Sequence, residues 1–144
     1  MQNDVDTQIL MKNITKKYGE HLILENIDLQ IRKGDFICIF GKSGGGKSTL
    51  LNIIGTLENY DSGDLISFSK LNPIRDAKDR DYLRREKIAY LFQNFALVEN
   101  MTVEENMKLA IKYRKVKDKA GCITSALRAM GVSDKLKSKV FELS

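Results

Sequence analysis

The segment from Gly41 to Ser48 constrains the fold of this chain more than any other feature. It reads Gly-Lys-Ser-Gly-Gly-Gly-Lys-Ser and fits the pattern G-x-x-x-x-G-K-[ST]. Phe36–Phe40 before it is apolar throughout, as in a strand buried on both faces of a parallel sheet. Residues 47–57 after it carry apolar side chains at helical spacing. We therefore predict a strand, a tight loop and a helix in succession.

Such a loop binds phosphate for a physical reason. Glycines let backbone N–H groups turn toward phosphate oxygens without obstruction by side chains, and the following helix adds its positive end. The ammonium of Lys47 would reach the β and γ phosphates of a nucleotide, and the hydroxyl of Ser48 would bind Mg²⁺. A glycine-rich turn without a ligand is the alternative, and the flanking strand and helix disfavour it. The predicted nucleotide-binding residues are Gly41, Lys42, Ser43, Gly44, Gly45, Gly46, Lys47, Ser48 and Thr49.

Length and charge limit the other classes of protein. The 144 residues suffice for one well-buried core. The net charge of +5 is spread along the chain, so we predict no nucleic-acid partner. The one dense basic run is interpreted as a solvated helix face or loop, with a contact surface as the alternative; it consists of Lys112, Arg114, Lys115, Lys117 and Lys119.

The distribution of apolar residues and cysteines favours a cytosolic protein. No run approaches the ~18 apolar residues that span a bilayer, and the polar residues 1–6 do not resemble a secretory signal. Cys38 lies within an apolar run and is predicted to be buried, whereas Cys122 lies in a helical segment. A disulfide is therefore not expected, which fits a reducing compartment. The single histidine, His21, is predicted to be an exposed turn residue.

Periodicity predicts the remaining elements. Strands are expected over residues 7–14, 22–31, 65–68 and 88–92, with a turn at 61–63. Helices are expected over residues 76–86, 102–114 and 119–130. Thr102 and Glu105 have the spacing of a capping box, and Gly131 would end the last helix. The order of elements predicts an α/β core followed by a helical part from about residue 100.

The phosphate loop alone leaves the enzyme class open. A GTPase would carry D-x-x-G after a strand and N-K-x-D for the base. Asp118–Gly121 fits the first pattern but lies in a basic helical stretch, and the second pattern is absent. A GTPase is therefore disfavoured.

Several further segments, taken in order, resemble the ATP-binding subunits of ABC transporters over almost the whole chain. They are Tyr18-Gly19, the loop 41–49, Asp61-Ser62-Gly63, Tyr90–Gln93 and residues 97–106. The resemblance implies a P-loop NTPase (RecA-like) α/β core with an antiparallel β subdomain and the beginning of an α-helical subdomain. It implies a partial ABC ATP-binding domain, with the β subdomain and P-loop core in residues 1–93 and the Q-loop and helical subdomain in 94–144.

The resemblance also assigns roles to two residues outside the loop. Tyr18 is similar to the aromatic residue that stacks on adenine, the alternative being an exposed turn tyrosine. Gln93 resembles the Q-loop glutamine that contacts Mg²⁺ or the attacking water, the alternative being a polar strand end. Residues 94–101 would face the transmembrane permease. Phe95, Leu97 and Val98 would then fill a groove in this partner or pack inward.

The implied function is an ATP-binding subunit that binds ATP and Mg²⁺ and works as a head-to-tail dimer. It would couple ATP hydrolysis to transport by a membrane permease, at the cytoplasmic face of the membrane. General similarity is greatest to export systems for peptides, bacteriocins, macrolides or lipoproteins. A non-transport ABC-type ATPase and a catalytically dead nucleotide-binding fragment stay open as alternatives.

The resemblance includes an expected truncation. Residues 143–144, Leu-Ser, are similar to the start of the family's L-S-G-G-Q signature, and no strand ending in Asp-Glu follows Gln93. The C-terminal part of the core would then be missing. We expect the 144-residue chain to be inactive in ATP hydrolysis and poorly stable alone, because Phe36–Phe40 would lack its parallel neighbours.

Overall fold

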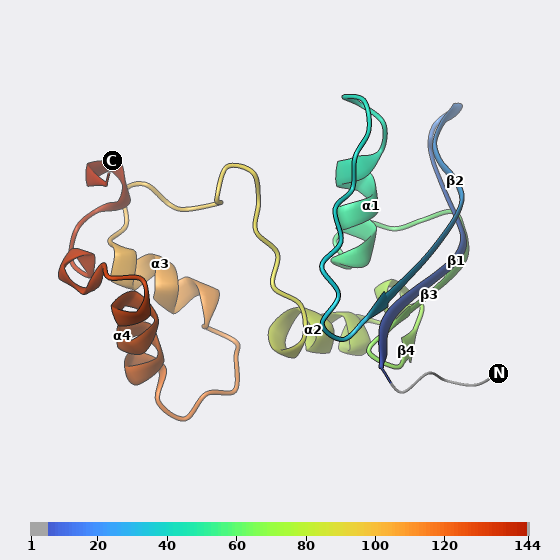
Figure 1. Ribbon diagram of the computed structural model, residues 1–144. Coiled ribbons are helices and arrows are strands. Elements are labelled where there is room, and N and C mark those ends of the chain that lie inside the picture. Colours follow the sequence, from blue (N-terminus) through green and yellow to red (C-terminus); the bar gives the residue numbers. More distant parts are fainter. Residues whose placement is uncertain (1–5, 144) are drawn as a thin grey trace. The chain divides into compact units, whose positions relative to one another are not determined.

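The computed structural model describes residues 6–143, and contacts divide the chain into two compact units, one ending at Ala89 and one beginning at Tyr90. Each unit has its own elements, which Figure 1 traces along the sequence. Among residues 6–143, no helix has the length and apolar character needed to cross a bilayer.

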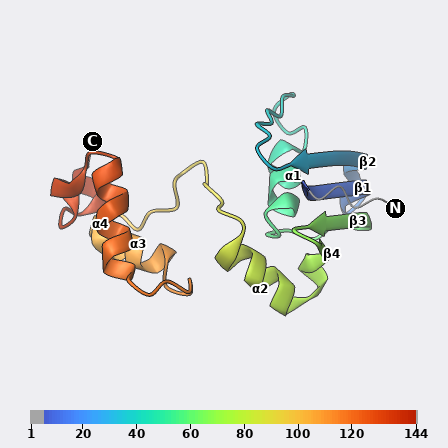
Figure 2. The same cartoon turned by 60° about the horizontal axis from the view of Figure 1, so that its bottom comes forward.

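The first unit is built on an antiparallel sheet. Its strands are β1 (Thr7–Tyr18), β2 (His21–Arg32), β3 (Ser62–Ser67) and β4 (Lys70–Leu71). They lie in the order β2-β1-β3-β4, and each pairing is antiparallel (Figure 2). The register pairs Tyr18 with His21 across the turn Gly19-Glu20, so β1 and β2 form a tight hairpin that ends beside Tyr18. The strands at 7–14, 22–31 and 65–68 were predicted, although β3 begins inside the predicted turn.

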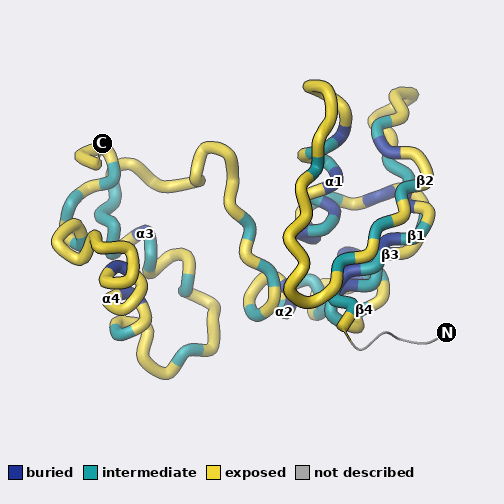
Figure 3. Tube along the Cα trace, viewed as in Figure 1, coloured by how far each residue is buried: buried dark blue, intermediate teal, exposed yellow. Residues whose placement is uncertain are grey.

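Helix α1 (Lys47–Ile54) covers one face of this sheet. Leu50 and Ile53 of α1 are buried against Met11 and Ile14 of β1 and Leu65 of β3. Alternate residues of a strand point to the same face, so Ile9 and Met11 of β1 reach the core together. The register of β1 shifts between Met11 and Ile14, where Asn13 has φ of 51°, and this irregularity lets Ile14 join them in the core. Within the first unit, Figure 3 shows buried segments in the sheet and in α1.

Two predicted strands are absent from the described residues. Phe36–Phe40 forms no strand there; Phe36 is 91% exposed and Phe40 is 88% exposed. Residues 88–92 likewise form no strand. A strand exists only when its N–H and C=O groups pair with a neighbour, and no parallel neighbour lies within residues 6–143. Cys38 is exposed for the same reason, so its predicted burial is wrong.

The first unit ends with a short 3₁₀ turn, η1 (Pro73–Arg75), and helix α2 (Ala77–Glu86). Asp76 caps α2 by accepting hydrogen bonds from the backbone N–H groups of Lys78 and Asp79. Arg84 of α2 donates to the backbone carbonyl and the hydroxyl of buried Thr56, which lies just beyond α1. This contact ties α2 to the end of α1.

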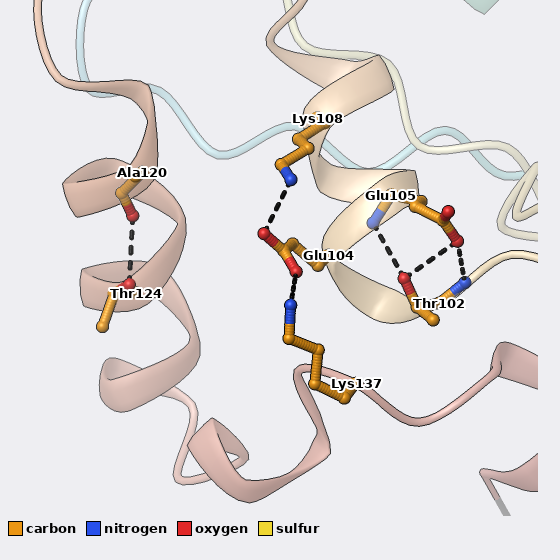
Figure 4. A network of polar contacts seen from close by, with 7 residues as sticks. All are labelled: Thr102, Glu104, Glu105, Lys108, Ala120, Thr124 and Lys137. Carbon is orange, nitrogen blue, oxygen red and sulfur yellow. Dashed lines mark hydrogen bonds and ion pairs between the residues drawn. The ribbon is translucent and has the colours of Figure 1, made fainter.

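The second unit is helical. It contains α3 (Val103–Ala110), α4 (Lys119–Ala129) and two 3₁₀ turns, η2 (Ser133–Lys135) and η3 (Val140–Glu142). Ile123 and Leu127 of α4 are buried. Thr102 and Glu105 form the predicted capping box, in which each side chain accepts from the other residue's backbone N–H (Figure 4). Glu104 pairs with Lys108 and Lys137, which ties α3 to the segment before η3.

Candidate functional site

The loop before α1 has the backbone shape that its glycines predict. Gly44 and Gly46 both have φ of 76°, a left-handed conformation that glycine adopts readily and other residues rarely adopt. The N–H of Gly45 donates to the carbonyl of Lys42 over 3.1 Å, which closes a tight turn. Gly46 then stands as the N-cap of α1, and its carbonyl accepts the N–H of Leu50 at 2.8 Å. The loop therefore leads directly into the N-terminus of α1.

Gly46 is also the point of closest packing in the loop. A Cβ atom there would lie 2.8 Å from Cδ2 of Leu24 and 3.0 Å from the carbonyl oxygen of Ile23. Both neighbours belong to β2, so the glycine lets the loop approach the sheet closely. Sequence reasoning assigned the glycines to phosphate access alone, and the structure adds this packing requirement at Gly46.

The side chain of Lys47 folds back along the loop. Its Nζ donates to the carbonyl of Gly41 at 2.8 Å and to the carbonyl of Lys42 at 2.6 Å. The ammonium is thus held inside the curve of residues 41–47 at the helix N-terminus. Two positive features, the ammonium and the helix dipole, act at the same place, and both favour a bound anion.

Tyr18 lies beside this loop. An open cleft of about 330 Å³ is lined by Tyr18, Ile23 and residues 43–49. Tyr18 is the last residue of β1, and 48% of its surface is exposed. The fold therefore brings the predicted stacking residue and most of the predicted phosphate-binding residues to one cleft, although they are 25 or more positions apart in the chain.

Glu58, which the sequence did not single out, holds Tyr18 in place. The hydroxyl of Tyr18 donates to Oε1 of Glu58, and the Nζ of Lys16 lies 4.9 Å from the centre of the Tyr18 ring. Burial alone would raise the pKa of the Glu58 carboxyl, but hydrogen bonds from Tyr18 and Asn52 and the charge of Lys16 together lower it. Glu58 is therefore held in its ionised form. No local pattern marks Glu58, because its partner is 40 positions away.

The residues fit a magnesium-bound nucleotide in their chemistry. Ser48 and Thr49 line the cleft in the first turn of α1, and Ser48 is exposed. Hydroxyl and phosphate oxygens are the hard ligands that Mg²⁺ prefers. The left-handed glycines leave room for oxygen atoms against the backbone.

Gln93 belongs to the second unit. It is exposed and lines a shallow hollow with Tyr90, Phe92 and Asn94. The rings of Tyr90 and Phe92 pack against each other, with centroids 4.7 Å apart. Gln93 lies in a turn that the N–H of Phe95 closes by donating to the carbonyl of Phe92 at 2.9 Å.

Residues 94–101 form an exposed loop with a firm anchor. Phe95, Leu97 and Val98 are all exposed, so they do not pack inward in the described structure; Phe95 is 65% exposed. Buried Asn106 of α3 accepts the N–H of Val98 at 2.8 Å and donates to its carbonyl at 3.0 Å. The anchor holds the backbone while the apolar side chains face outward.

Comparison with known proteins agrees with this geometry. The family model described as "ABC transporter" matches residues 24–144. The macrolide export ATP-binding/permease protein MacB of Campylobacter jejuni is 42% identical over 142 residues, covering 94% of this chain and 22% of that protein. The methionine import ATP-binding protein MetN of the same species is 35% identical, covering 94% of this chain and 46% of that protein. The chain thus spans less than half the length of these curated relatives.

A solved structure gives the same result for the fold. The ATP-binding cassette MJ0796, from Methanocaldococcus jannaschii, was determined as a dimer in a post-hydrolysis state bound to ADP and Pi. It superposes with a TM-score of 0.78 at 34% identity, covering 94% of this chain and 63% of that one. The fold is therefore that of the P-loop NTPase cassettes. The loop geometry and the match over residues 24–144 agree: the chain belongs to the ABC transporter family through its ATP-binding domain.

Proposed function

We propose that this chain binds Mg-ATP in the cleft between Tyr18 and residues 43–49. The single observation that supports it best is the convergence of left-handed glycines, the Lys47 ammonium and an exposed aromatic ring on one cleft. On binding, Lys47 would exchange its two carbonyl partners for oxygens of the β and γ phosphates. Tyr18 would stack on the adenine ring.

Ser48, in the first unit, is the proposed ligand of Mg²⁺. Gln93 is the proposed residue that contacts Mg²⁺ or orients the attacking water. Magnesium, when bound, would supply positive charge that offsets the negative charge developing on the phosphates during transfer. Lys47 adds positive charge at the same phosphates, and the N-terminus of α1 adds its dipole. Hydrolysis further requires a carboxylate that holds the metal, and we assign none within this chain. We therefore expect the 144-residue chain alone to bind ATP without appreciable turnover.

The whole protein is proposed to act as a head-to-tail dimer that drives export by a membrane permease. Two observations support these steps: the MJ0796 cassette was solved as a dimer, and the macrolide export protein MacB is 42% identical over 94% of this chain. The exposed loop 94–101 is the proposed permease contact, placing the protein at the cytoplasmic face of the membrane. The division into residues 1–93 and 94–144 stays a prediction. Co-purification of a multi-spanning permease from native membranes tests this part.

The nucleotide assignment is tested by calorimetric titration of the purified chain with ATP and Mg²⁺. Hydrogen bonds to a charged group contribute about 1.5–3 kcal/mol, so Lys47→Ala should weaken ATP binding by roughly ten- to 150-fold. Lys33→Ala is the matched control, because Lys33 is exposed in the turn after β2 and does not line the cleft. Equal affinities of the two variants, or no binding by the unsubstituted chain, would refute the proposal.

A further inference from the structure

Tyr18 is held in place by two side chains. Its hydroxyl donates to Oε1 of Glu58, which fixes one edge of the ring. The Nζ of Lys16 lies 4.9 Å from the ring centre, which places a cation over one face of the ring. Yet 48% of Tyr18 is exposed, and the residue lines the cleft. The ring is therefore accessible and also constrained.

Glu58 is constrained in turn from two directions. The Nζ of Lys16 lies 3.5 Å from Oε1, and the amide of Asn52 donates to Oε2 at 3.3 Å. The side chains of Lys16 and Glu58 are only 12% and 19% exposed, so this pair is poorly screened by solvent compared with a surface pair. Asn52 lies on α1, the helix that begins at Lys47. Glu58 therefore connects the tip of the β1–β2 hairpin to the helix that carries the phosphate loop.

We propose that Glu58 is a positioning residue for the nucleotide base: it fixes the ring of Tyr18 at the edge of the cleft, with Lys16 over one face and the other face directed to the base. The inference rests on the proposed binding of ATP. It deepens that proposal, because it makes the base-stacking surface depend on a carboxylate that itself touches no part of the nucleotide.

The physical reason is preorganisation. Stacking of a base on an aromatic side chain contributes only a modest affinity, and part of it is lost when the ring must first be immobilised. Glu58 orders the ring before the nucleotide arrives. The ordering cost of one side chain corresponds to about a two- to tenfold change in affinity. The effect should fall on the base and leave phosphate binding unchanged.

The experiment compares ATP with inorganic tripolyphosphate, each with Mg²⁺, on the 144-residue chain. Tripolyphosphate shares the phosphates but lacks the base and the sugar, so the ratio of the two dissociation constants reports the contribution of the nucleoside. Glu58→Ala should weaken ATP binding about two- to tenfold with tripolyphosphate binding unchanged. Glu58→Gln retains an oxygen that can accept from the Tyr18 hydroxyl, so it should restore most of the ratio. Glu25→Ala, an exposed glutamate on β2, serves as the matched control.

A double-substitution cycle isolates the Tyr18–Glu58 hydrogen bond. In Tyr18→Phe the ring remains but its hydroxyl is gone, so adding Glu58→Ala should change the ratio little further. If Glu58→Ala weakened the binding of ATP and of tripolyphosphate equally, the role of Glu58 would be merely structural and the inference would be overturned. Unchanged binding of ATP by Glu58→Ala would overturn it as well. If the unsubstituted chain bound neither ligand, the proposed function itself would fail.

Discussion

Substitution of Gly46 by alanine tests whether the phosphate loop is built by close approach to the sheet as well as by backbone conformation. Gly44 offers a matched control, because both glycines have φ of 76° and belong to the same loop. A Cβ at Gly44 would meet nothing within 4 Å. At Gly46 it would lie 2.8 Å from Cδ2 of Leu24 and 3.0 Å from the carbonyl oxygen of Ile23.

The two variants share one cost and differ in another. Alanine in the left-handed region costs about 1–2 kcal/mol, and this term applies to both. Gly46→Ala adds the cost of overpacking, about 1–3 kcal/mol, because the Ile23 carbonyl is backbone and cannot rotate away. The methyl end of Leu24 can adjust, which places the expected value toward the lower half of that range. Effects of alanine on the unfolded chain are common to both variants and cancel.

Urea unfolding provides the measurement. Tyrosine fluorescence reports mainly on the first unit, since Tyr18, Tyr60 and Tyr82 lie there and the chain has no tryptophan. With a denaturant slope of about 2 kcal/mol per molar urea, the extra cost should lower the midpoint of Gly46→Ala by roughly 0.5–1 M relative to Gly44→Ala. Identical midpoints for the two variants would refute the argument that the loop is packed against β2.

Two further predictions concern the second unit. Asn106→Ala should lower the free energy of unfolding by about 1–3 kcal/mol and speed hydrogen exchange at the Val98 amide, because it leaves backbone groups of Val98 unpaired. Asn106→Asp keeps the acceptor for the Val98 N–H and should slow that exchange again. Unchanged exchange in both variants would disprove the anchor. Hydrogen bonds from Lys108 and Lys137 lower the pKa of Glu104 from 4.5 to about 2, so its contribution to stability is present above pH 4.5 and is lost as pH falls through about 2. Carboxyl NMR should show this midpoint, and Lys137→Met should raise it; a midpoint near 4.5 in the unsubstituted chain would contradict the pairing.

Local patterns in the sequence determined the loop and the helices. Gly44 and Gly46 adopt a left-handed backbone that other residues disfavour, so the turn into α1 follows from their identity. The capping box of Thr102 and Glu105 was predictable for a similar reason, since its partners are three positions apart. Helices form from contacts within a few residues, and their periodicity is therefore visible in the chain itself.

The tertiary structure decided the features that depend on distant partners. Phe36–Phe40 has the composition of a buried strand, but a strand needs a neighbour to pair with, and the described residues supply none. Glu58 meets Tyr18 only because the β1–β2 hairpin ends beside the segment that follows α1. The sequence by itself thus determined the phosphate loop, whose conformation is local. The arrangement that would orient a base depends on side chains 40 positions apart, and only the folded chain brings them together.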